Sequence, residues 1–173
     1  MKKPYLFLLL VCLLTISLVA CASSRDQYIR IHIRANSDNA IDQETKLEVR
    51  DAIIAYLAPY ANSAKDKSHM MRLINDNIQA IKVEADKALK ANNVNYYAEV
   101  ELSREVFPTK TYGDLTLKSG EYDALIINLG EGTGGNWWCV AFPPLCFIPT
   151  EEDIGEEIVY KSKIAEWLSS IFN

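Results

Sequence analysis

The chain has few of the residue types that most often build catalytic and metal centres. Its 173 residues include only two histidines, His32 and His69, and four cysteines. A zinc site needs three or four ligands at a workable spacing, and these residues are too far apart in the sequence to predict one. A thiol nucleophile needs a nearby histidine to form its thiolate, and pairing Cys139 with either histidine would require the same long-range coincidence. We therefore expect no metal and no cofactor.

An excess of positive charge is also absent. The chain has 18 basic and 23 acidic residues, a net charge of −5. Without residues 1–20, which hold two lysines and no acidic residue, 16 basic residues would face 23 acidic ones, a net charge of −7. An acidic domain of this kind does not attract a phosphate backbone, and no run of lysines is present that would hold it to anionic lipid. We expect no nucleic-acid partner.

Long hydrophobic runs are confined to the N-terminus. Lys2 and Lys3 precede a nearly uninterrupted apolar stretch from Tyr5 to Val19, which is short for a transmembrane helix and has the form of an export signal. The small residues before Cys21 resemble a lipobox, in which this cysteine is lipidated and becomes the new N-terminus. Simple secretion and an uncleaved anchor are the alternatives. We expect a signal in residues 1–21, a polar tether in 22–27 and one extracytoplasmic domain in 28–173.

Cysteine usage agrees with export. Cys12 lies in the signal and Cys21 at its end, so Cys139 and Cys146 remain as a pair in the exported domain. Disulfides persist outside the cytoplasm, and the spacer between these two cysteines contains a Pro-Pro pair. We predict a Cys139–Cys146 disulfide, with two buried thiols as the alternative.

Hydrophobic periodicity predicts the elements of the domain. Ile29, Ile31 and Ile33 alternate with polar residues, which predicts a half-buried strand with a polar outer face of Arg30, His32 and Arg34. Apolar stripes predict helices over residues 40–61, ending or bending at Pro59, over 65–91 and over 156–172. Further strands are predicted over 94–102, 112–117, 122–129 and 137–142.

The order of these elements predicts the fold class. Strands and helices do not alternate regularly, as they would in a parallel sheet. We therefore expect an α+β domain with a mainly antiparallel sheet, on which the two long helices of the N-terminal half and the C-terminal helix pack.

The glycine-rich segment GEGTGG, residues 130–135, invites comparison with a phosphate-binding loop. A dinucleotide fingerprint requires its glycines to open a helix, whereas the residues from Trp137 to Val140 have a strand pattern, and no P-loop lysine follows. We interpret the segment as a flexible hairpin connection between the strands on either side.

Acidic residues leave a further alternative open. Several lie near predicted strand or helix ends: Asp38, Asp42, Glu121, Asp123 and Glu131. A carboxylate pair of a cell-wall hydrolase and an ordinary solvated surface both fit this placement. An extracytoplasmic hydrolase and a passive envelope lipoprotein therefore remain alternative functions.

The most unusual residues are the paired tryptophans Trp137 and Trp138. Adjacent side chains of a strand point to opposite faces, so one tryptophan can enter the core while the other faces out, unless another element covers it. Phe142 and Leu145 continue the apolar character through a Pro-Pro bend that cannot extend a regular sheet. An exposed aromatic beside a rigid apolar loop is typical of a protein-binding hot spot. The alternative is a second core layer beneath the C-terminal helix.

Three blocks of sequence carry a resemblance to a known family. They are IRIHIRANSDNAIDQETKLEVRDAI, FPTKTYG and SGEYDALIINLGEGTGGNWWCVAFPPLCF, and together they run from about Tyr28 to Phe147. They resemble the stage II sporulation protein R family (SpoIIR), most specifically in NWWCVAFPPLC.

The resemblance implies a signalling protein of endospore-forming bacteria. It implies synthesis in the forespore and export into the space between the forespore and mother-cell membranes. The implied partner is a membrane-embedded aspartic protease (SpoIIGA-like), which the protein activates so that the protease cleaves a mother-cell sigma-factor precursor. The chain would then be a messenger, neither an enzyme nor a binder of a small-molecule substrate.

The resemblance also suggests which residues meet the partner. We expect Trp137, Trp138, Phe142 and Leu145 to contact the partner or shape the loop, and the segment from Phe107 to Lys110 to form a second patch. A lipid on Cys21 would hold the protein at a membrane and raise its effective concentration there.

Overall fold

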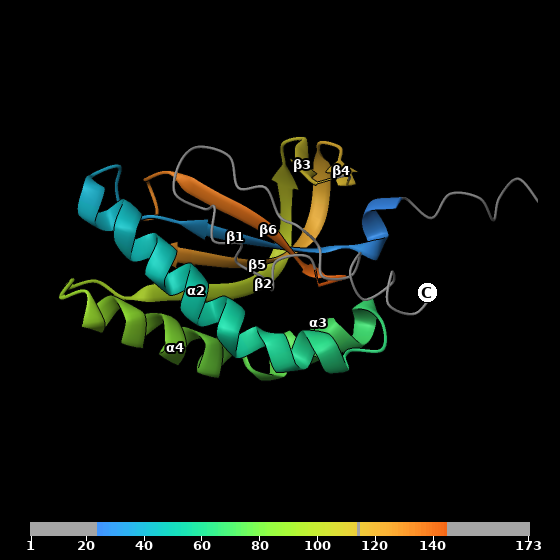
Figure 1. Cartoon of the computed structure of the whole chain (residues 1–173), viewed down its shortest axis with the longest axis horizontal. Coiled ribbons are helices and arrows are strands. Elements are labelled where there is room, and N and C mark those ends of the chain that lie inside the picture. Colours follow the sequence, from blue (N-terminus) through green and yellow to red (C-terminus); the bar gives the residue numbers. More distant parts are fainter. Residues whose placement is uncertain (1–23, 114, 145–173) are drawn as a thin grey trace, which may run out of the picture.

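A mixed four-stranded sheet forms the centre of the fold (Figure 1). The computed structural model describes residues 24–113 and 115–144. The sheet has the order β2 (Ala98–Phe107), β5 (Gly120–Leu129), β1 (Ile29–Arg34) and β6 (Asn136–Phe142). The pairs β2–β5 and β1–β6 are antiparallel, whereas β1 and β5 are parallel. The α+β class is confirmed, and the sheet is mixed because its first strand pairs in parallel with β5.

The connection between β5 and β6 is not a hairpin, contrary to the prediction. β1 lies between these two strands, so residues 130–135 must pass over the end of β1. The crossing is held by backbone hydrogen bonds from Gly134 N to Ala35 O, 2.9 Å, and from Ala35 N to Gly135 O, 3.3 Å. The hairpin was predicted because β5 and β6 are consecutive in the sequence. In the structure, β1 from the start of the domain pairs with both of them.

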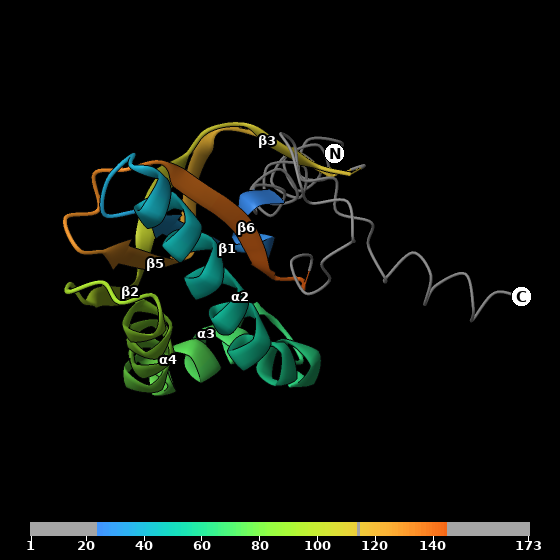
Figure 2. The same ribbon diagram turned by 60° about the vertical axis from the view of Figure 1, so that its left-hand side comes forward.

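Helices cover one face of the sheet, as Figures 1 and 2 show. They are α2 (Ala40–Ser63), α3 (Lys67–Asp76) and α4 (Ile78–Ala91). Val49, Ile53 and Leu57 of α2 are buried in one core with Ile31 of β1 and Ile81 of α4, because their spacing places them on one side of each element. Pro59 lies inside α2, which continues to Ser63, so of the two predicted outcomes at this proline, an end or a bend, the end is excluded.

The predicted helix over residues 65–91 is divided in two by Asn77. Its backbone is not helical, at φ −110° and ψ 9°. The Asn77 side chain donates to Leu73 O, 2.8 Å, and accepts from the hydroxyl groups of Tyr56, 3.0 Å, and Tyr60, 3.2 Å. These bonds join the break to α2, a tertiary contact that the apolar stripe of α3 and α4 does not reveal.

The opposite side of the sheet carries a small hairpin. β3 (Lys110–Tyr112) and β4 (Leu115–Leu117) pair with each other and stand out from the main sheet in Figure 1. The predicted strand over 112–117 includes the last residue of β3 and the whole of β4. The strand predicted over 94–102 begins later, at Ala98, and a short 3-10 helix, η1 (Ser24–Gln27), precedes β1. The predicted C-terminal helix, residues 156–172, lies outside the described residues.

Candidate functional site

The polar face of β1 is buried, not solvated as the alternation of IRIHIR suggested. Arg30 is fully buried and His32 is 5% exposed, while Arg34 is partly buried. Two buried charged or ionisable side chains on one strand face require partners or carry a free-energy cost. We call these three side chains, together with their partners on the other strands, the polar face. The partners are Glu105 of β2, Tyr112 of β3, Asn128 of β5 and Asn136 of β6.

His32 and Arg34 share one carboxylate. The two ring nitrogens of His32 lie 2.7 Å from Glu105 Oε2 and 2.7 Å from Asn136 Oδ1. Arg34 forms an ion pair with the other oxygen of Glu105 and donates to Asn128 Oδ1 at 2.7 Å. Strands β1, β2, β5 and β6 each contribute a member, so this cluster connects the whole width of the main sheet.

An aromatic row continues from this cluster to the rim of the polar face. The His32 ring lies 5.7 Å from that of Phe107 and 5.5 Å from that of Trp138, measured between ring centroids. Lys110 Nζ lies 4.6 Å from the centroid of the Trp138 ring, within the range of a cation–π contact. The two patches that the sequence suggested separately, around Trp138 and from Phe107 to Lys110, therefore meet in the structure.

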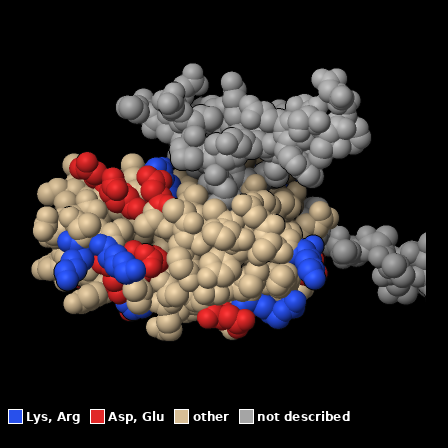
Figure 3. Space-filling model, turned by 60° about the horizontal axis from the view of Figure 1, so that its bottom comes forward, with Lys and Arg blue, Asp and Glu red and all other residues tan. Residues whose placement is uncertain are grey.

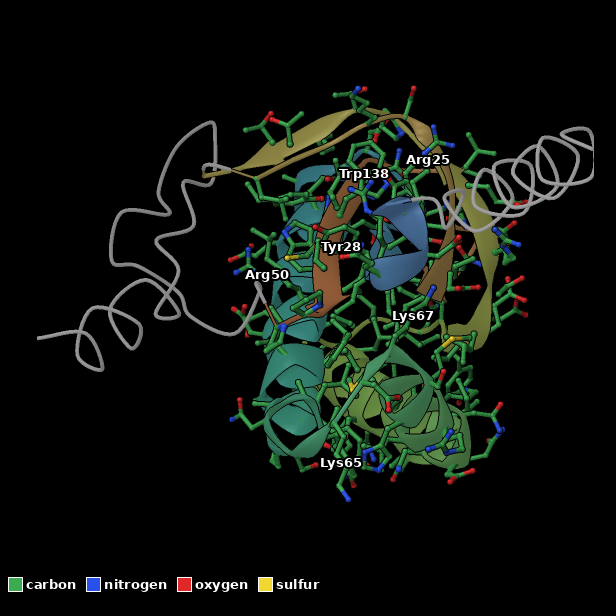
Figure 4. All side chains as sticks on the ribbon, turned by 90° about the vertical axis from the view of Figure 1, so that its right-hand side faces the viewer. Arg25, Tyr28, Arg50, Lys65, Lys67 and Trp138 are labelled. Carbon is green, nitrogen blue, oxygen red and sulfur yellow. The ribbon has the colours of Figure 1, made fainter. Side chains whose placement is uncertain are left out.

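The two tryptophans face opposite sides, as the strand geometry predicted. Trp137 is 6% exposed, and the guanidinium group of Arg50 on α2 lies 5.8 Å from its ring centroid. Trp138 is partly buried on the hairpin side (Figure 4). Trp137 and Phe107, 1% exposed, are both buried in the core, so these two predicted contact residues present almost no surface. The accessible surface comes from Trp138, Lys110 and the partly buried Phe142, while Leu145 lies outside the described residues.

The cysteine and histidine candidates are separated by the sheet. Cys139 is opposite Ile31 in the register and is buried in the core on the helix side, whereas His32 faces the other way. Cys139 is also disulfide-bonded, so it is not a free thiol. Its predicted partner, Cys146, lies outside the described residues, and the pairing stays a prediction. His69 accepts a hydrogen bond from Lys65 N at the start of α3, far along the chain from both.

The glycine-rich segment is a fitted part of the fold. A Cβ atom on Gly134 would overlap the backbone of Ser37, so the loop packs directly on the turn before α2. Lys46 Nζ donates to Gly135 O at 2.9 Å and to Gln43 Oε1 at 2.7 Å. Burial lowers the pKa of Lys46. A strand follows the segment and no helix begins there, which agrees with the rejection of a phosphate loop.

Asp42 organises the turn beside that loop. Its carboxylate accepts hydrogen bonds from Ser37, 2.6 Å, Tyr96, 2.7 Å, Asn36, 2.8 Å, and Asn39, 3.0 Å. Burial alone would raise the pKa of Asp42, but these bonds outweigh it and lower the pKa. This acidic candidate therefore has a structural role: it is an ionised acceptor shared by four donors, which we call the ionised hub.

The remaining acidic candidates are spread over the surface or paired. Asp123 forms ion pairs with Lys67 and, at 3.8 Å, with Arg104, which also lies 3.2 Å from Glu121. Asp38 and Glu131 are exposed. Among residues 24–113 and 115–144, no group of three or more metal-ligating side chains is assembled. On the helix side, Figure 3 shows basic and acidic side chains interleaved in small groups, with broad uncharged surface between them.

Sequence reasoning missed Arg30, Glu105 and Asn136. The available signal was three basic residues alternating within one strand, in a chain whose overall charge is acidic. That pattern predicted a solvent-exposed face, because nothing local shows that the rings of Phe107, Tyr112 and Tyr122 surround Arg30.

The described residues thus define an α+β domain whose sheet has an apolar face under helices and a second face of connected charged and aromatic groups. No described helix has both the length and the apolar character needed to cross a bilayer. The sequence matches the model of the stage II sporulation protein R family over residues 25–152. The chain belongs to this family.

A curated relative supports the same assignment. The chain is 39% identical over 123 residues to the Stage II sporulation protein R of Bacillus subtilis (strain 168). The match covers 71% of this chain and 55% of the relative, so it spans about half of the relative's length. Both matches are named as sporulation proteins and neither name describes an enzyme. No solved structure matches the chain.

Proposed function

We propose that the chain is an exported messenger of endospore formation, which activates a membrane-embedded aspartic protease so that a mother-cell sigma-factor precursor is cleaved. Its membership in the stage II sporulation protein R family supports the role in sporulation, and the resemblance of its motifs supports the signalling step. To activate its receptor, the messenger must bind the active arrangement more tightly than the inactive one.

One structural observation carries the proposed interface. Trp138 belongs to the motif NWWCVAFPPLC and Lys110 to the motif FPTKTYG. The two side chains lie in contact at the rim of the polar face. Behind them, the His32 ring packs against the Trp138 ring, and the buried Phe107 packs against His32 in turn. A partly exposed aromatic on a rigid support is the arrangement found at interface hot spots, because little conformational entropy is lost on binding.

The disulfide at Cys139 supports an extracytoplasmic location, because disulfides are rare in the reducing cytoplasm. The lipidated Cys21 belongs to the same proposal and lies outside the described residues. A lipid-mass shift of the mature N-terminus, or processing that globomycin blocks, would support lipidation. A free and unmodified N-terminus would contradict it.

The central experiment is reconstitution in a non-sporulating bacterium. The full chain is co-expressed with the candidate protease and its sigma-factor precursor, and precursor cleavage is followed on a blot. We expect cleavage only when the chain is present and exported. Absence of cleavage, with all three proteins present and the chain folded outside the cytoplasm, would refute activation of that protease.

Matched variants then test the interface within the same assay. Trp138→Ala and Lys110→Ala alter the rim of the polar face, whereas Tyr97→Ala removes a comparable aromatic that is 73% exposed before β2. We expect the first two to reduce cleavage at least about tenfold, the scale of a hot-spot residue, and the Tyr97 variant to signal normally. Equal activity of all three at equal exported levels would exclude this rim as the interface.

A further inference from the structure

Arg30 is a buried cation with unused hydrogen-bonding capacity. The side chain is fully buried, and its Nη2 donates to the Tyr112 hydroxyl group at 2.5 Å. Its Nε and Nη1 atoms have no hydrogen-bond partner among the described residues. Buried donors of a charged group are normally satisfied, because leaving them unpaired costs more than leaving a neutral group unpaired.

Among residues 24–113 and 115–144, no acidic side chain forms an ion pair with Arg30. None of the described ion pairs includes Arg30, and Glu105, the carboxylate of the polar face, is already shared by His32 and Arg34. Burial raises the pKa of Tyr112 by more than the neighbouring Arg30 lowers it, so the Tyr112 hydroxyl group stays protonated. The phenol therefore does not neutralise the guanidinium group.

Three aromatic rings surround this guanidinium group. Its carbon lies 4.2 Å from the ring centroid of Phe107, 5.2 Å from that of Tyr122 and 5.7 Å from that of Tyr112. Such contacts stabilise a cation and hold its plane in a fixed orientation. We call these three rings the cage. Aromatic rings do not accept the in-plane N–H groups of Arg30, so Nε and Nη1 could still donate to the oxygen atoms of a ligand.

A cavity adjoins the cage. Its volume is about 390 Å³, and it is lined by Arg25, Tyr28, Tyr122 and residues 115–118. Tyr122 connects the two, because it lines the cavity and its ring also faces the guanidinium group of Arg30. The described lining contains two basic residues, Arg25 and Lys118, and no acidic one. Figure 4 shows Arg25, which is part of η1, and Tyr28 beside it.

The cover over Arg30 is not part of the main sheet. Tyr112 belongs to the β3–β4 hairpin, whose strands pair with each other and are not part of the main sheet. Displacing the Tyr112 side chain alone would break the Arg30–Tyr112 bond, but no hydrogen bond of the four-stranded ladder.

We infer that Arg30 is the buried anchor of a binding site for a carboxylate, presented by an acidic segment of a partner polypeptide that enters through the adjoining cavity and displaces Tyr112. A carboxylate matches the planar donors of a guanidinium group and neutralises its charge, and Arg25 and Lys118 would attract the acidic segment to the entrance. The inference extends the proposed function by giving the partner's chemistry. Binding is measured without the protease, so the two can fail independently.

The test is a titration of the full-length chain by isothermal calorimetry. The probes are an acetylated and amidated peptide with one central glutamate, its glutamine twin, and the small acid benzoate with neutral benzamide as its control. We expect saturable binding of the glutamate peptide and at least about tenfold weaker binding of the glutamine twin. Absence of a difference between the twins would overturn the inference. Binding of benzoate without the peptide would overturn the polypeptide ligand and assign the site to a small organic acid.

Variants at Arg30 separate a binding role from a packing role. Arg30→Met keeps the length and removes the charge, and we expect it to lose peptide binding while its melting temperature equals or exceeds that of the parent chain. Peptide binding that persists at parental affinity in this variant would overturn the inference. If Arg30→Met does not fold, Arg30→Lys keeps the charge without the planar donors and is expected to bind at least about tenfold more weakly. Parental affinity in the lysine variant would overturn the inference equally.

Discussion

Replacing Asp42 by asparagine is the sharpest test of how the turn before α2 is held. The substitution keeps the size of the side chain but removes the charge that four donors share, from Asn36, Ser37, Asn39 and Tyr96. It also places an amide N–H₂ group against at least one of these donors. Asp42 is 3% exposed, so water cannot replace the lost bonds.

The magnitude follows from the number and type of these bonds. A hydrogen bond to a charged group contributes about 1.5–3 kcal/mol and a neutral one about 1 kcal/mol. If two of the four bonds are weakened and one is lost, the free energy of unfolding falls by about 3 kcal/mol. For a domain of this size, that corresponds to a decrease in melting temperature of about 6–12 °C.

The dependence on pH gives the decisive control. The pKa of Asp42 is lowered in the folded protein from its ordinary value of 3.8, so its stabilising contribution is fully present above that value. The contribution is lost as the pH falls through the folded pKa. The difference in unfolding free energy between the parent chain and Asp42→Asn should therefore be complete at neutral pH and should narrow once the pH falls below 3.8.

Urea unfolding, followed by tryptophan fluorescence and circular dichroism, measures this difference. Asp38→Asn is the matched control, because Asp38 lies in the same turn but is exposed, and it should change stability by less than about 0.5 kcal/mol. A loss below about 1 kcal/mol for Asp42→Asn at neutral pH, or a gap that does not narrow on acidification, would refute the ionised hub.

Four further predictions test the surrounding structure. Gly134→Ala should lower stability by at least about 2 kcal/mol, because its Cβ would overlap the backbone of Ser37, whereas the atoms nearest to a Cβ on Gly135 belong to the flexible Gln43 side chain, so Gly135→Ala should cost less; equal melting temperatures would contradict this. Glu105→Gln should cost about 1–2 kcal/mol by urea unfolding, since both His32 and Arg34 lose a charged acceptor, and an unchanged midpoint would argue against the shared carboxylate. Trp137→Ala should cost about 3–5 kcal/mol and Trp138→Ala distinctly less, given their different burial; the reverse order would be inconsistent with the assigned faces. Non-reducing peptide mapping should recover Cys139 linked to Cys146, and any other partner for Cys139 would contradict the predicted pairing.

The role of the tryptophan pair in signalling is best tested with a single variant. Replacing both tryptophans would remove a core residue along with the surface one, because Trp137 packs on the helix side. Loss of signalling in the double variant would then reflect unfolding as much as lost contact. The single variant Trp138→Ala separates the two effects.

The elements of the fold were largely predictable from the sequence. The alternation of Ile29, Ile31 and Ile33 indicated β1, and the apolar spacing of Val49, Ile53 and Leu57 belongs to α2. These patterns arise from side-chain periods of a single element, so they survive without tertiary information. Asn77 divided the second predicted helix because it bonds to two tyrosines of α2, a contact between residues distant in sequence.

The candidate site was predicted in its parts and not in its assembly. The family-like motifs pointed to Trp138 and to Lys110, but nothing in their spacing indicated that Lys110 lies over the Trp138 ring. Arg30 read as a solvated residue of a half-buried strand, and its burial depends on Phe107, Tyr112 and Tyr122. Such residues are brought together by strand order and by a hairpin, neither of which leaves a local signal.

The sequence by itself determined the helices and strands, the α+β class, the opposite facing of the two tryptophans and the family. Each of these depends on local periodicity or on contiguous motifs. Only the tertiary structure decided that β1 lies between β5 and β6, and that the charged side of β1 is covered. The physical reason is that pairing partners and burial are properties of two surfaces at once, whereas a periodic pattern describes only one.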